Sequence, residues 1–373
     1  MKIVAIDLGK GKSVACVYSR TAESIMRGTA ADRRFVTLPT RPREVHDLIA
    51  AEAPDRVVIE IGPPAGWVCD LCRKMGVQVQ VANPNHEAWR WKNVKKKTDR
   101  DDAEKLARLS ESGDLPLVHV PEPEVRARRE LIAYRHSLVR RMTAIKNSIR
   151  AILTRQALAW PKGKCGWTDR AVKELKELAA GGEDLWRRML GEELGLMSTL
   201  GSSIASVEKR LDELGEASDQ VKLVRTIPGV GPRLAEVIVA TLDKPERFKT
   251  GRQVGCYAGL TPRIFQSGSM DRQGKISGQG PTLLRSLLVE VSWLGRRWNP
   301  WMDRVYQNAL RGSKARKKIA ITALARRLLV VAWAMLRDNK PWNGPARTDG
   351  KRRVKEETPG TGQTPARPVM PVC

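Results

Sequence analysis

The sequence predicts an α/β domain at its N-terminal end, followed by a mostly helical region. Two observations support this fold class. Short apolar and β-branched runs alternate with helical patterns up to about residue 120, after which long helical spacings replace the strand pattern. The chain has 373 residues, which exceeds the usual size of one compact domain, so we expect two or three folding units.

The N-terminal region contains five predicted strands. Gly9 and Gly11 indicate a turn between the first two, and Pro63-Pro64 ends the fourth, whose β-branched residues suit a buried central strand. The predicted strands are Ile3–Asp7, Ser13–Tyr18, Arg34–Leu38, Arg56–Ile61 and Val77–Ala82, and the predicted helices are Pro42–Glu52, Trp67–Met75 and a further helix beyond Asn83-Pro84. Three strands, helix, strand, helix, strand, helix is the element order of an RNase H-like domain.

Two heptad seams mark the helical middle of the chain. We expect an antiparallel pair of helices, or a dimer contact, to bury both seams in a coiled coil. The seams consist of Leu138, Met142, Ile145, Ile149 and Ile152, and of Ile204, Val207, Leu211 and Leu214. The first helix also carries Arg140, Arg141 and Lys146, which either contact phosphates or form a solvated face.

A third region opens with a glycine turn between two short helices, Pro228-Gly229-Val230-Gly231-Pro232, which is a helix-hairpin-helix signature. Gly229 and Gly231 would let backbone N–H groups approach a phosphate; the alternative is a tight helix connection without a ligand. We therefore expect four segments: an RNase H-like domain over residues 1–120, a helical dimerisation region over 121–220, a mostly helical domain over 221–340 and a disordered, proline-rich tail over 341–373.

The charge balance predicts a polyanionic partner. The chain has 67 Lys and Arg against 41 Asp and Glu, a formal charge of +26 and a pI near 10.3. The positive charge is spread along the whole chain and no apolar run reaches the roughly 18 residues of a membrane span, so nucleic acid is favoured over a membrane. The start, Met1 to Asp7, lacks the layout of a secretory signal, which predicts a cytoplasmic protein.

Cys69 and Cys72 form a CxxC pair without a second pair at zinc spacing, so a buried helix face is the expected role for them.

Four carboxylates are candidate metal ligands. Asp7 and Glu60 end two predicted strands, and Asp99 and Asp102 lie three residues apart on one helical face, whereas Asp101 points about 100° away. Four clustered carboxylates would need a cation among them, and Mg²⁺ prefers oxygen ligands and bridges phosphate oxygens. The alternative is that the two helical aspartates balance the helix dipole and that Glu60 pairs with an arginine.

A glycine- and serine-rich loop is predicted near residues 266–280, between helices. Ser267, Ser269 and Ser277 lie in it, and a serine hydroxyl can attack phosphorus if a metal or base lowers the barrier. The alternative is that these serines are turn residues and helix caps. Spacing alone leaves both readings open.

Five short motifs follow one another in a specific order. They are Asp7-Leu8-Gly9, Glu60, Lys97-Thr98-Asp99-Arg100-Asp101-Asp102-Ala103, Pro228-Gly229-Val230-Gly231-Pro232 and Tyr257-Ala258-Gly259-Leu260-Thr261-Pro262. In this order and spacing they resemble the IS110 family of transposases over roughly residues 1–340. The resemblance implies an N-terminal RuvC-like domain with a metal site at Asp7, Glu60, Asp99 and Asp102, and a C-terminal transposase domain with a catalytic serine.

The family pattern of a serine followed by glycine falls on Ser267-Gly268, which makes Ser267 the expected nucleophile and Ser269 the second choice, while Ser277 is expected to contact backbone phosphate. The resemblance also implies a structured noncoding guide RNA that pairs with donor and target DNA. Because the acidic site and the serine lie in different predicted domains, we also expect a homodimer that assembles to a tetramer on DNA. The residues expected to contact nucleic acid are Lys95, Lys96, Lys97, Arg140, Arg141, Lys146, Gly229, Gly231, Arg263 and Lys275. Two alternatives remain open: a Holliday-junction nuclease that uses metal-activated water, and a non-catalytic nucleic-acid-binding protein.

Overall fold

The structure is a computed structural model that describes residues 1–21, 23, 26–27, 30–83, 98–160, 166–267 and 270–344. The chain forms two compact units, Met1–Arg128 and Arg129–Cys373. Lys95, Lys96, Lys97 and Ser269, for which roles in nucleic-acid binding or catalysis are predicted, and nearly all of the predicted tail lie outside the described residues.

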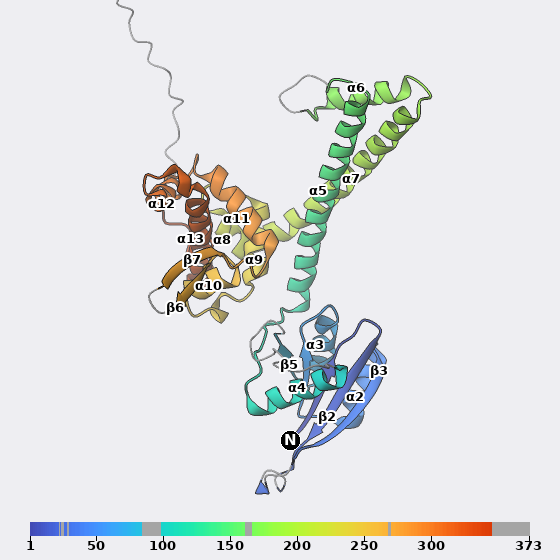
Figure 1. Cartoon of the computed structure of the whole chain (residues 1–373), viewed down its shortest axis with the longest axis vertical. Coiled ribbons are helices and arrows are strands. Elements are labelled where there is room, and N and C mark those ends of the chain that lie inside the picture. Colours follow the sequence, from blue (N-terminus) through green and yellow to red (C-terminus); the bar gives the residue numbers. More distant parts are fainter. Residues whose placement is uncertain are drawn as a thin grey trace, which may run out of the picture. The chain divides into compact units, whose positions relative to one another are not determined.

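The first unit contains a mixed five-stranded sheet (Figure 1). In the strand order β3-β2-β1-β4-β5, the pairs β3–β2 and β2–β1 are antiparallel, and β1–β4 and β4–β5 are parallel. The elements are β1 (Lys2–Asp7), β2 (Lys12–Ser19), β3 (Asp32–Pro39), α2 (Pro42–Glu52), β4 (Arg56–Glu60), α3 (Ala65–Lys74), β5 (Gln78–Ala82) and α4 (Asp99–Ser112). The predicted RNase H-like order of elements is confirmed.

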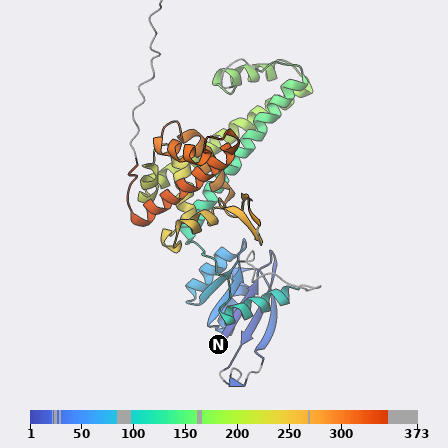
Figure 2. The ribbon, with the colours of Figure 1, turned by 60° about the vertical axis from the view of Figure 1, so that its left-hand side comes forward.

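Both faces of this sheet are covered, which explains why β1 is apolar at almost every position. Val4 and Ile6 pack with α2 and α3 on one face, whereas Ile3 and Ala5 pack with α4 on the other. Figure 2 shows the helix α4 lying across one face of the sheet. The turn that joins β1 to β2 requires Gly9, because a Cβ at this position would overlap the Lys12 carbonyl oxygen.

Cys69 and Cys72 are buried in the core on α3, as the sequence predicts. Burial raises the pKa of the Cys72 thiol to about 12, which favours an unreactive, neutral side chain.

The second unit is mostly helical. Its elements, beginning with a helix whose first residues belong to the first unit, are α5 (Pro123–Arg155), α6 (Asp169–Ala180), α7 (Leu185–Glu216), α8 (Asp219–Arg225), α9 (Pro232–Leu242), η2 (Pro245–Arg247), α10 (Gly251–Tyr257), β6 (Pro262–Ser267), β7 (Met270–Ile276), α11 (Thr282–Gly295), α12 (Pro300–Leu310), η3 (Lys314–Arg316) and α13 (Lys317–Asp338).

The long helices α5 and α7 lie side by side and run in opposite directions (Figure 1). The guanidinium of Arg135 donates to Glu208 Oε1 at 2.8 Å, and Ser148 Oγ donates to Glu193 Oε1 at 2.7 Å. Because the partner's number falls as the number on α5 rises, the pair is antiparallel. Leu138 on α5 and Leu211 on α7, both from the predicted seams, are buried.

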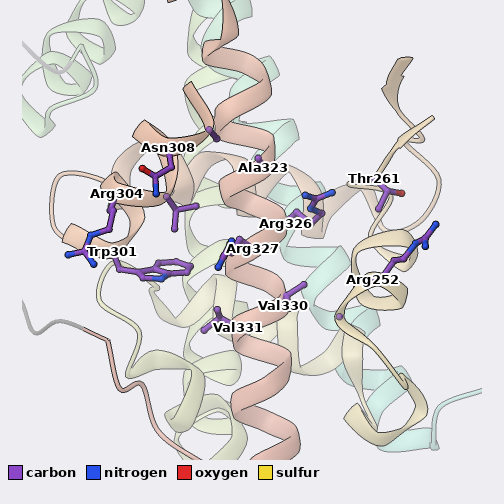
Figure 3. A pocket seen from close by; sticks show the side chains of 13 residues that line it. Arg252, Thr261, Trp301, Arg304, Asn308, Ala323, Arg326, Arg327, Val330 and Val331 are labelled. Atoms are coloured by element: carbon purple, nitrogen blue, oxygen red, sulfur yellow. The ribbon is translucent and has the colours of Figure 1, made fainter. Parts of the chain in front are cut away.

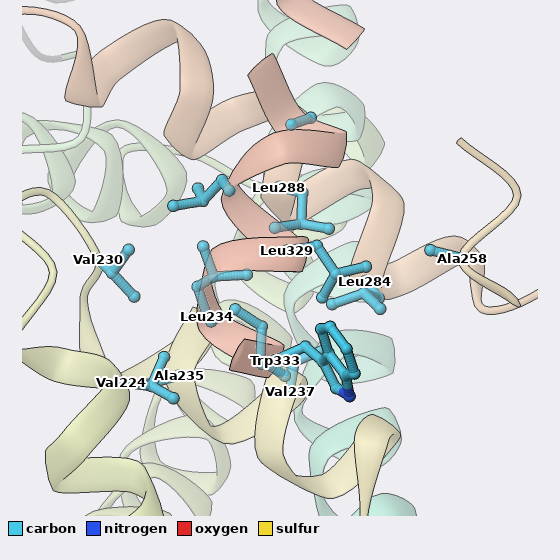
Figure 4. Packing of buried hydrophobic residues seen from close by; sticks show 14 of the residues in the cluster. Val224, Val230, Leu234, Ala235, Val237, Ala258, Leu284, Leu288, Leu329 and Trp333 are labelled. Atoms are coloured by element: carbon cyan, nitrogen blue, oxygen red, sulfur yellow. The ribbon is translucent and has the colours of Figure 1, made fainter. Parts of the chain in front are cut away.

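The core of the second unit is built around α13. Leu329 and Trp333 of this helix pack against Leu284 and Leu288 of α11 and against residues of α9 (Figure 4). Lys314–Asp338 is the one stretch of the described chain that is long and apolar enough to cross a membrane, but 56% of its most apolar window is buried inside the protein. Its hydropathy therefore reflects its position as a core helix.

The segment predicted as a loop around residue 267 instead forms a two-stranded antiparallel ribbon, β6–β7, between α10 and α11. Ser267 pairs with Met270, so only two residues connect the strands. Ile264 and Phe265 on β6 are each more than half exposed. The strands escaped prediction because their alternation is interrupted by a register shift between Pro262 and Ile264 and by glycines and serines typical of loops.

Candidate functional site

Asp7 and Glu60 occupy the carboxyl ends of two neighbouring parallel strands. Ile6 of β1 is in register with Ile59 of β4, and Asp7 and Glu60 are the next residues of each strand. Side chains alternate along a strand, so Asp7 lies on the same face as Ala5, and Glu60 on the same face as Val58. Both carboxylates therefore project from the face of the sheet that α4 covers.

The helix α4 runs antiparallel to these strands, so that its first turn lies at their carboxyl ends. At its other end, Glu111 accepts hydrogen bonds from Tyr18 (2.5 Å) and Arg20 (2.7 Å), which are paired with the beginning of β1. The Ser110 hydroxyl donates to Gln80 of β5 at 2.7 Å. Asp99 and Asp102, near the N-terminus of α4, are thus placed at the same end and face of the sheet as Asp7 and Glu60.

A capping box fixes the start of α4. The Thr98 hydroxyl accepts a hydrogen bond from the Asp101 amide at 3.3 Å, and the Thr98 amide donates to Asp101 Oδ2 at 3.0 Å. The Thr98 hydroxyl also donates to Asp101 Oδ2 at 2.7 Å, and this bond, together with the one from the Thr98 amide, lowers the pKa of the Asp101 carboxyl. Asp101 therefore caps the N-terminus of α4. Asp102, by contrast, is buried against the sheet at 8% exposure. Asp99, the first helical residue, is exposed.

The donor chemistry of the four predicted ligands fits a hard divalent cation, because all are carboxylates. Among the residues that the structure describes, however, no three His, Cys, Asp or Glu side chains are close enough to hold a metal ion. Asp7, Glu60, Asp99 and Asp102 thus share one face and one end of the sheet without forming a closed ligand group. The acidic first turn of α4 also stabilises the helix dipole, so the alternative role of Asp99 and Asp102 is compatible with the same placement.

Ser267 is exposed at the end of β6, beside the two-residue connection of the ribbon. Ser277, by contrast, lies at the base of the ribbon, where its amide donates to the Thr261 carbonyl at 2.8 Å and its carbonyl accepts from Arg263 at 3.3 Å. The ribbon therefore presents Ser267 to solvent at its tip and anchors the residues near Ser277.

The glycine turn between α8 and α9 is packed on one side and open on the other. Gly229 has φ of 91°, and a Cβ there would lie 3.1 Å from Gly295 Cα. Buried Asn299 donates from Nδ2 to the Pro228 carbonyl at 3.0 Å. Gly229 therefore has a packing role, whereas Gly231 is exposed and has open space at its Cβ position.

We predict that Asn299→Ala lowers the melting temperature of the full-length protein by several degrees. The Asn299 side-chain oxygen Oδ1 caps α12 by accepting from Trp301 N at 3.0 Å, and its side-chain amide donates to the Pro228 carbonyl. Loss of both contributions costs about 2–4 kcal/mol. Circular dichroism melting measures this. Asn299→Asp keeps the cap acceptor but buries a carboxylate against the Pro228 carbonyl oxygen, so it should melt no higher than Asn299→Ala; equal melting of all three proteins would contradict the assignment.

The basic residues predicted to contact nucleic acid differ in their surroundings. Arg140 and Arg141 are exposed on α5, and Lys275 is exposed on β7. The Lys146 ammonium lies 5.1 Å from the centre of the Trp167 ring, a cation–π contact that gives it a structural partner. Arg263 is exposed but holds the Ser277 carbonyl. Arg140, Arg141 and Lys275, which are exposed, are therefore the better candidates for contacts with nucleic acid.

Two residues that position this site were not singled out from the sequence. Thr98 is followed three residues later by Asp101, which is a capping-box spacing, and Asn299 precedes Pro300, which is the pattern of an N-cap followed by proline. Both signals were present. Their roles become clear only from the structure. The Thr98 cap engages the Asp101 carboxylate, and Asn299 donates to the turn at Pro228.

Two family profiles match the chain. The profile of the DEDD domain of IS110, described as a transposase, matches residues 4–157, and the profile of the transposase IS116/IS110/IS902 family matches residues 221–307. The chain belongs to the IS110 family of transposases. Its membership in the IS110 family makes it a DNA transposase, and the first profile covers Asp7, Glu60, Asp99 and Asp102 while the second covers Ser267.

Several relatives of this IS110 protein carry related names. A putative transposase of Sinorhizobium fredii, y4rJ, is 28% identical over 75% of this chain and 76% of its own length. The transposase for insertion sequence element IS1111A of Coxiella burnetii is 27% identical, with 70% and 72% covered. The pilin gene-inverting protein of Moraxella bovis is 32% identical, but over 34% of this chain and 40% of its own length.

Among solved structures, RuvC of Thermus thermophilus is matched over its whole length and over 32% of this IS110 chain, with 16% identity and a TM-score of 0.22. The same protein in complex with a Holliday junction substrate gives 15% identity and a TM-score of 0.23. These scores are low, and the fold of the first unit is established instead by its own strand order and register.

Proposed function

We propose that this transposase cleaves and rejoins DNA strands with a composite site, in which Asp7, Glu60, Asp99 and Asp102 hold Mg²⁺ and Ser267 is the nucleophile. The observation that carries the proposal is the placement of all four carboxylates at one end and one face of the central sheet. An ordinary stabilising role would not require acidic side chains at the ends of two adjacent buried strands as well as on the helix that covers them.

The serine would act by forming a bond from its Oγ to phosphorus while the bond from phosphorus to one deoxyribose oxygen breaks. The serine proton ends on the leaving oxygen, which becomes a hydroxyl. The phosphoserine conserves the phosphodiester energy, so a second strand's hydroxyl can displace Ser267 and rejoin the DNA without ATP. The exposed position of Ser267 at the ribbon tip supports this role, because the hydroxyl needs access to a bulky backbone. Bound Mg²⁺ would supply charge neutralisation at the phosphate oxygens.

The carboxylates belong to the first unit and Ser267 to the second. A complete site therefore requires two units to meet on DNA, and we propose that copies of the chain exchange units in a homodimer that assembles to a tetramer. The helices α5 and α7 are candidates for the contact between copies. A constitutively monomeric active enzyme would contradict this assembly.

A guide RNA is the proposed source of sequence specificity. The sequence has no zinc-finger pattern and no clear helix-turn-helix for reading bases, and a formal charge of +26 is compatible with holding RNA as well as DNA.

The test is covalent capture of labelled DNA by the full-length protein, co-expressed with RNA transcribed from the DNA that flanks its gene. With Mg²⁺ we expect a protein–DNA adduct that survives SDS and is digested by protease. Chelation with EDTA should abolish the adduct and added Mg²⁺ should restore it, because carboxylate sites bind Mg²⁺ reversibly.

Treatment with RNase before DNA is added tests whether formation of the adduct requires the guide RNA. Loss of adduct after RNase supports the guide RNA, and an unchanged adduct would rule it out. DNA cleavage in Mg²⁺ without any covalent adduct would overturn the serine mechanism and favour a water nucleophile.

A further inference from the structure

We propose that a groove lined by arginines in the second unit binds a segment of single-stranded nucleic acid. The groove lies between α10, α12 and α13, and none of the residues assigned above to chemistry lines it. The inference rests on the proposed function to the extent that nucleic acid is taken as the partner, and it adds a binding site for that partner.

The groove has a volume of about 870 Å³, which is the size of a site that encloses a small organic ligand. Figure 3 shows α13 along its floor, with Trp301, Arg304 and Asn308 of α12 on one side and Arg252 of α10 with Thr261 on the other. A duplex is too wide to enter a space of this size, whereas a short stretch of one strand can.

Four arginines line this groove, and no acidic residue does. Within the part of the chain that the structure describes, none of their four guanidinium groups has a hydrogen bond or ion pair with the protein. Elsewhere in the same unit arginines are commonly paired, as Arg233 is with Glu236 and Arg296 with Asp303. The four are Arg252, Arg304, Arg326 and Arg327. Unpaired guanidinium groups around one concavity are arranged for an anion with several charges, because each offers a planar set of donors to phosphate.

The floor between the arginines is apolar. It is formed by short side chains, Ala309 and Ala323, and by the valines Val305, Val330 and Val331. A free phosphate or a duplex backbone would leave this apolar surface unused, whereas a single strand places sugars and base faces against it while its phosphates reach the rim. The combination of an apolar floor and a cationic rim therefore favours a single strand.

Two glycines let α10 pack closely against α13, and the first of them, Gly251, lines the groove. A Cβ at Gly251 would lie 2.7 Å from Val330 Cγ1, and one at Gly255 would lie 3.2 Å from Arg326 Cδ. Larger residues would push α10 away from α13 and displace the stem of Arg326. The two glycines therefore allow α10 to lie close to α13 and the Arg326 side chain to lie along α10.

The groove also borders the proposed catalytic ribbon. Thr261, which lines it, immediately precedes β6, and Ser267 is six residues further along the strand, or about 20 Å at the rise of a β-strand. A strand held in the groove would therefore flank the reacting phosphate, so the groove would position nucleic acid and take no part in bond breakage.

The experiment measures binding of a short fluorescent single-stranded oligonucleotide to the full-length protein by anisotropy, in EDTA and over a range of salt. Arg304→Gln/Arg327→Gln removes one charge from each of two helices without breaking a contact within the described protein. We expect affinity at low salt to fall roughly 10- to 100-fold and the slope of log affinity against log salt to decrease by about 1.4. Ala323→Glu, which puts a carboxylate one helical turn from Arg327, should give a similar loss.

The matched control is Lys176→Gln/Lys209→Gln, which removes the same charge from exposed positions on α6 and α7. Its affinity should stay within a few-fold of wild type. Equal losses in the control and groove variants, or wild-type binding by the groove variants, would overturn the proposal. Duplex DNA run in parallel should be less affected; a loss confined to duplex would refute the single-strand assignment.

An acidic protein segment is the competing occupant, and labelled polyglutamate tests it. Binding of polyglutamate that is lost in the groove variants, with unchanged oligonucleotide affinity, would replace nucleic acid by a protein partner. The assay contains no metal and requires no cleavage, so its result is independent of whether the carboxylates and Ser267 act as proposed. Melting curves of each variant verify that the fold is retained.

Discussion

Asp7→Asn is expected to abolish excision in cells, scored as the circular junction of the excised element by PCR. The substitution keeps the size of the side chain and removes the charge that would bind Mg²⁺ at the end of β1. Loss of a ligand should reduce activity by more than the roughly 10- to 100-fold that loss of an outer partner of a metal site costs. The protein should still fold, because Asp7 lies at the end of β1 and the strand's pairing with β2 and β4 uses the backbone.

Asp101→Asn is the matched control, since Asp101 is in the same turn as Asp99 and Asp102 but its carboxylate faces the Thr98 cap. We expect excision close to wild type, with at most a slightly less stable α4, because asparagine can still accept from the Thr98 amide. Equal loss of excision in Asp7→Asn and Asp101→Asn would show that general acidity of the first unit, and no specific metal site, supports the reaction. Wild-type excision by Asp7→Asn would overturn the carboxylate assignment.

Ser267→Ala is expected to remove both the covalent adduct and the excision junction, a loss of at least about a thousandfold, because residues that act as nucleophiles have effects of this order or larger. Binding of DNA should be unchanged, since the hydroxyl is a small part of the exposed ribbon. Anisotropy with unlabelled competitor verifies binding, and mass spectrometry of the wild-type adduct should locate the phosphate on the peptide that contains Ser267.

Ser277→Ala is the control within the same ribbon region, where the backbone of Ser277 is tied to Thr261 and Arg263. It should retain the adduct and at most weaken DNA binding. If Ser267→Ala retains the adduct while Ser269→Ala loses it, the nucleophile is Ser269 and the assignment is wrong by two residues. Retention of junctions in both variants would indicate that water attacks the phosphate.

The first unit could be predicted from sequence because its signals are local and agree with one another. β-Branched runs specify β1 and β4, and Gly9 specifies the turn that pairs β1 with β2. The positions of Asp7 and Glu60 at strand ends followed directly. The sequence does not show that these two carboxylates lie on the same face of the sheet as Asp102. That depends on strand register and on the direction in which α4 crosses the sheet.

Prediction was less complete in the second unit because its features are formed by residues distant in sequence. The arginine groove combines residues of α10, α12 and α13 that are far apart in the sequence, so no local pattern indicates that they share one surface. The role of Gly229 is likewise determined by its approach to Gly295, more than sixty positions away. A glycine needed for packing and a glycine that binds phosphate have the same sequence context. Only the structure distinguishes the two roles.

The contact of Glu111 with Tyr18 and Arg20, near the C-terminal end of α4, helps to set the position of Asp99 and Asp102 at its N-terminal end. Burial raises the pKa of Tyr18 to about 12, with the hydrogen bond to Glu111 contributing, so the phenol stays protonated and keeps donating at physiological pH. A helix is stiff along its axis, and a slip of one turn would move Asp102 by about 5.4 Å. The register of α4 is therefore set roughly 14 Å from the nearest proposed ligand, and variation at this remote polar contact can change cleavage without altering any residue that touches DNA or metal.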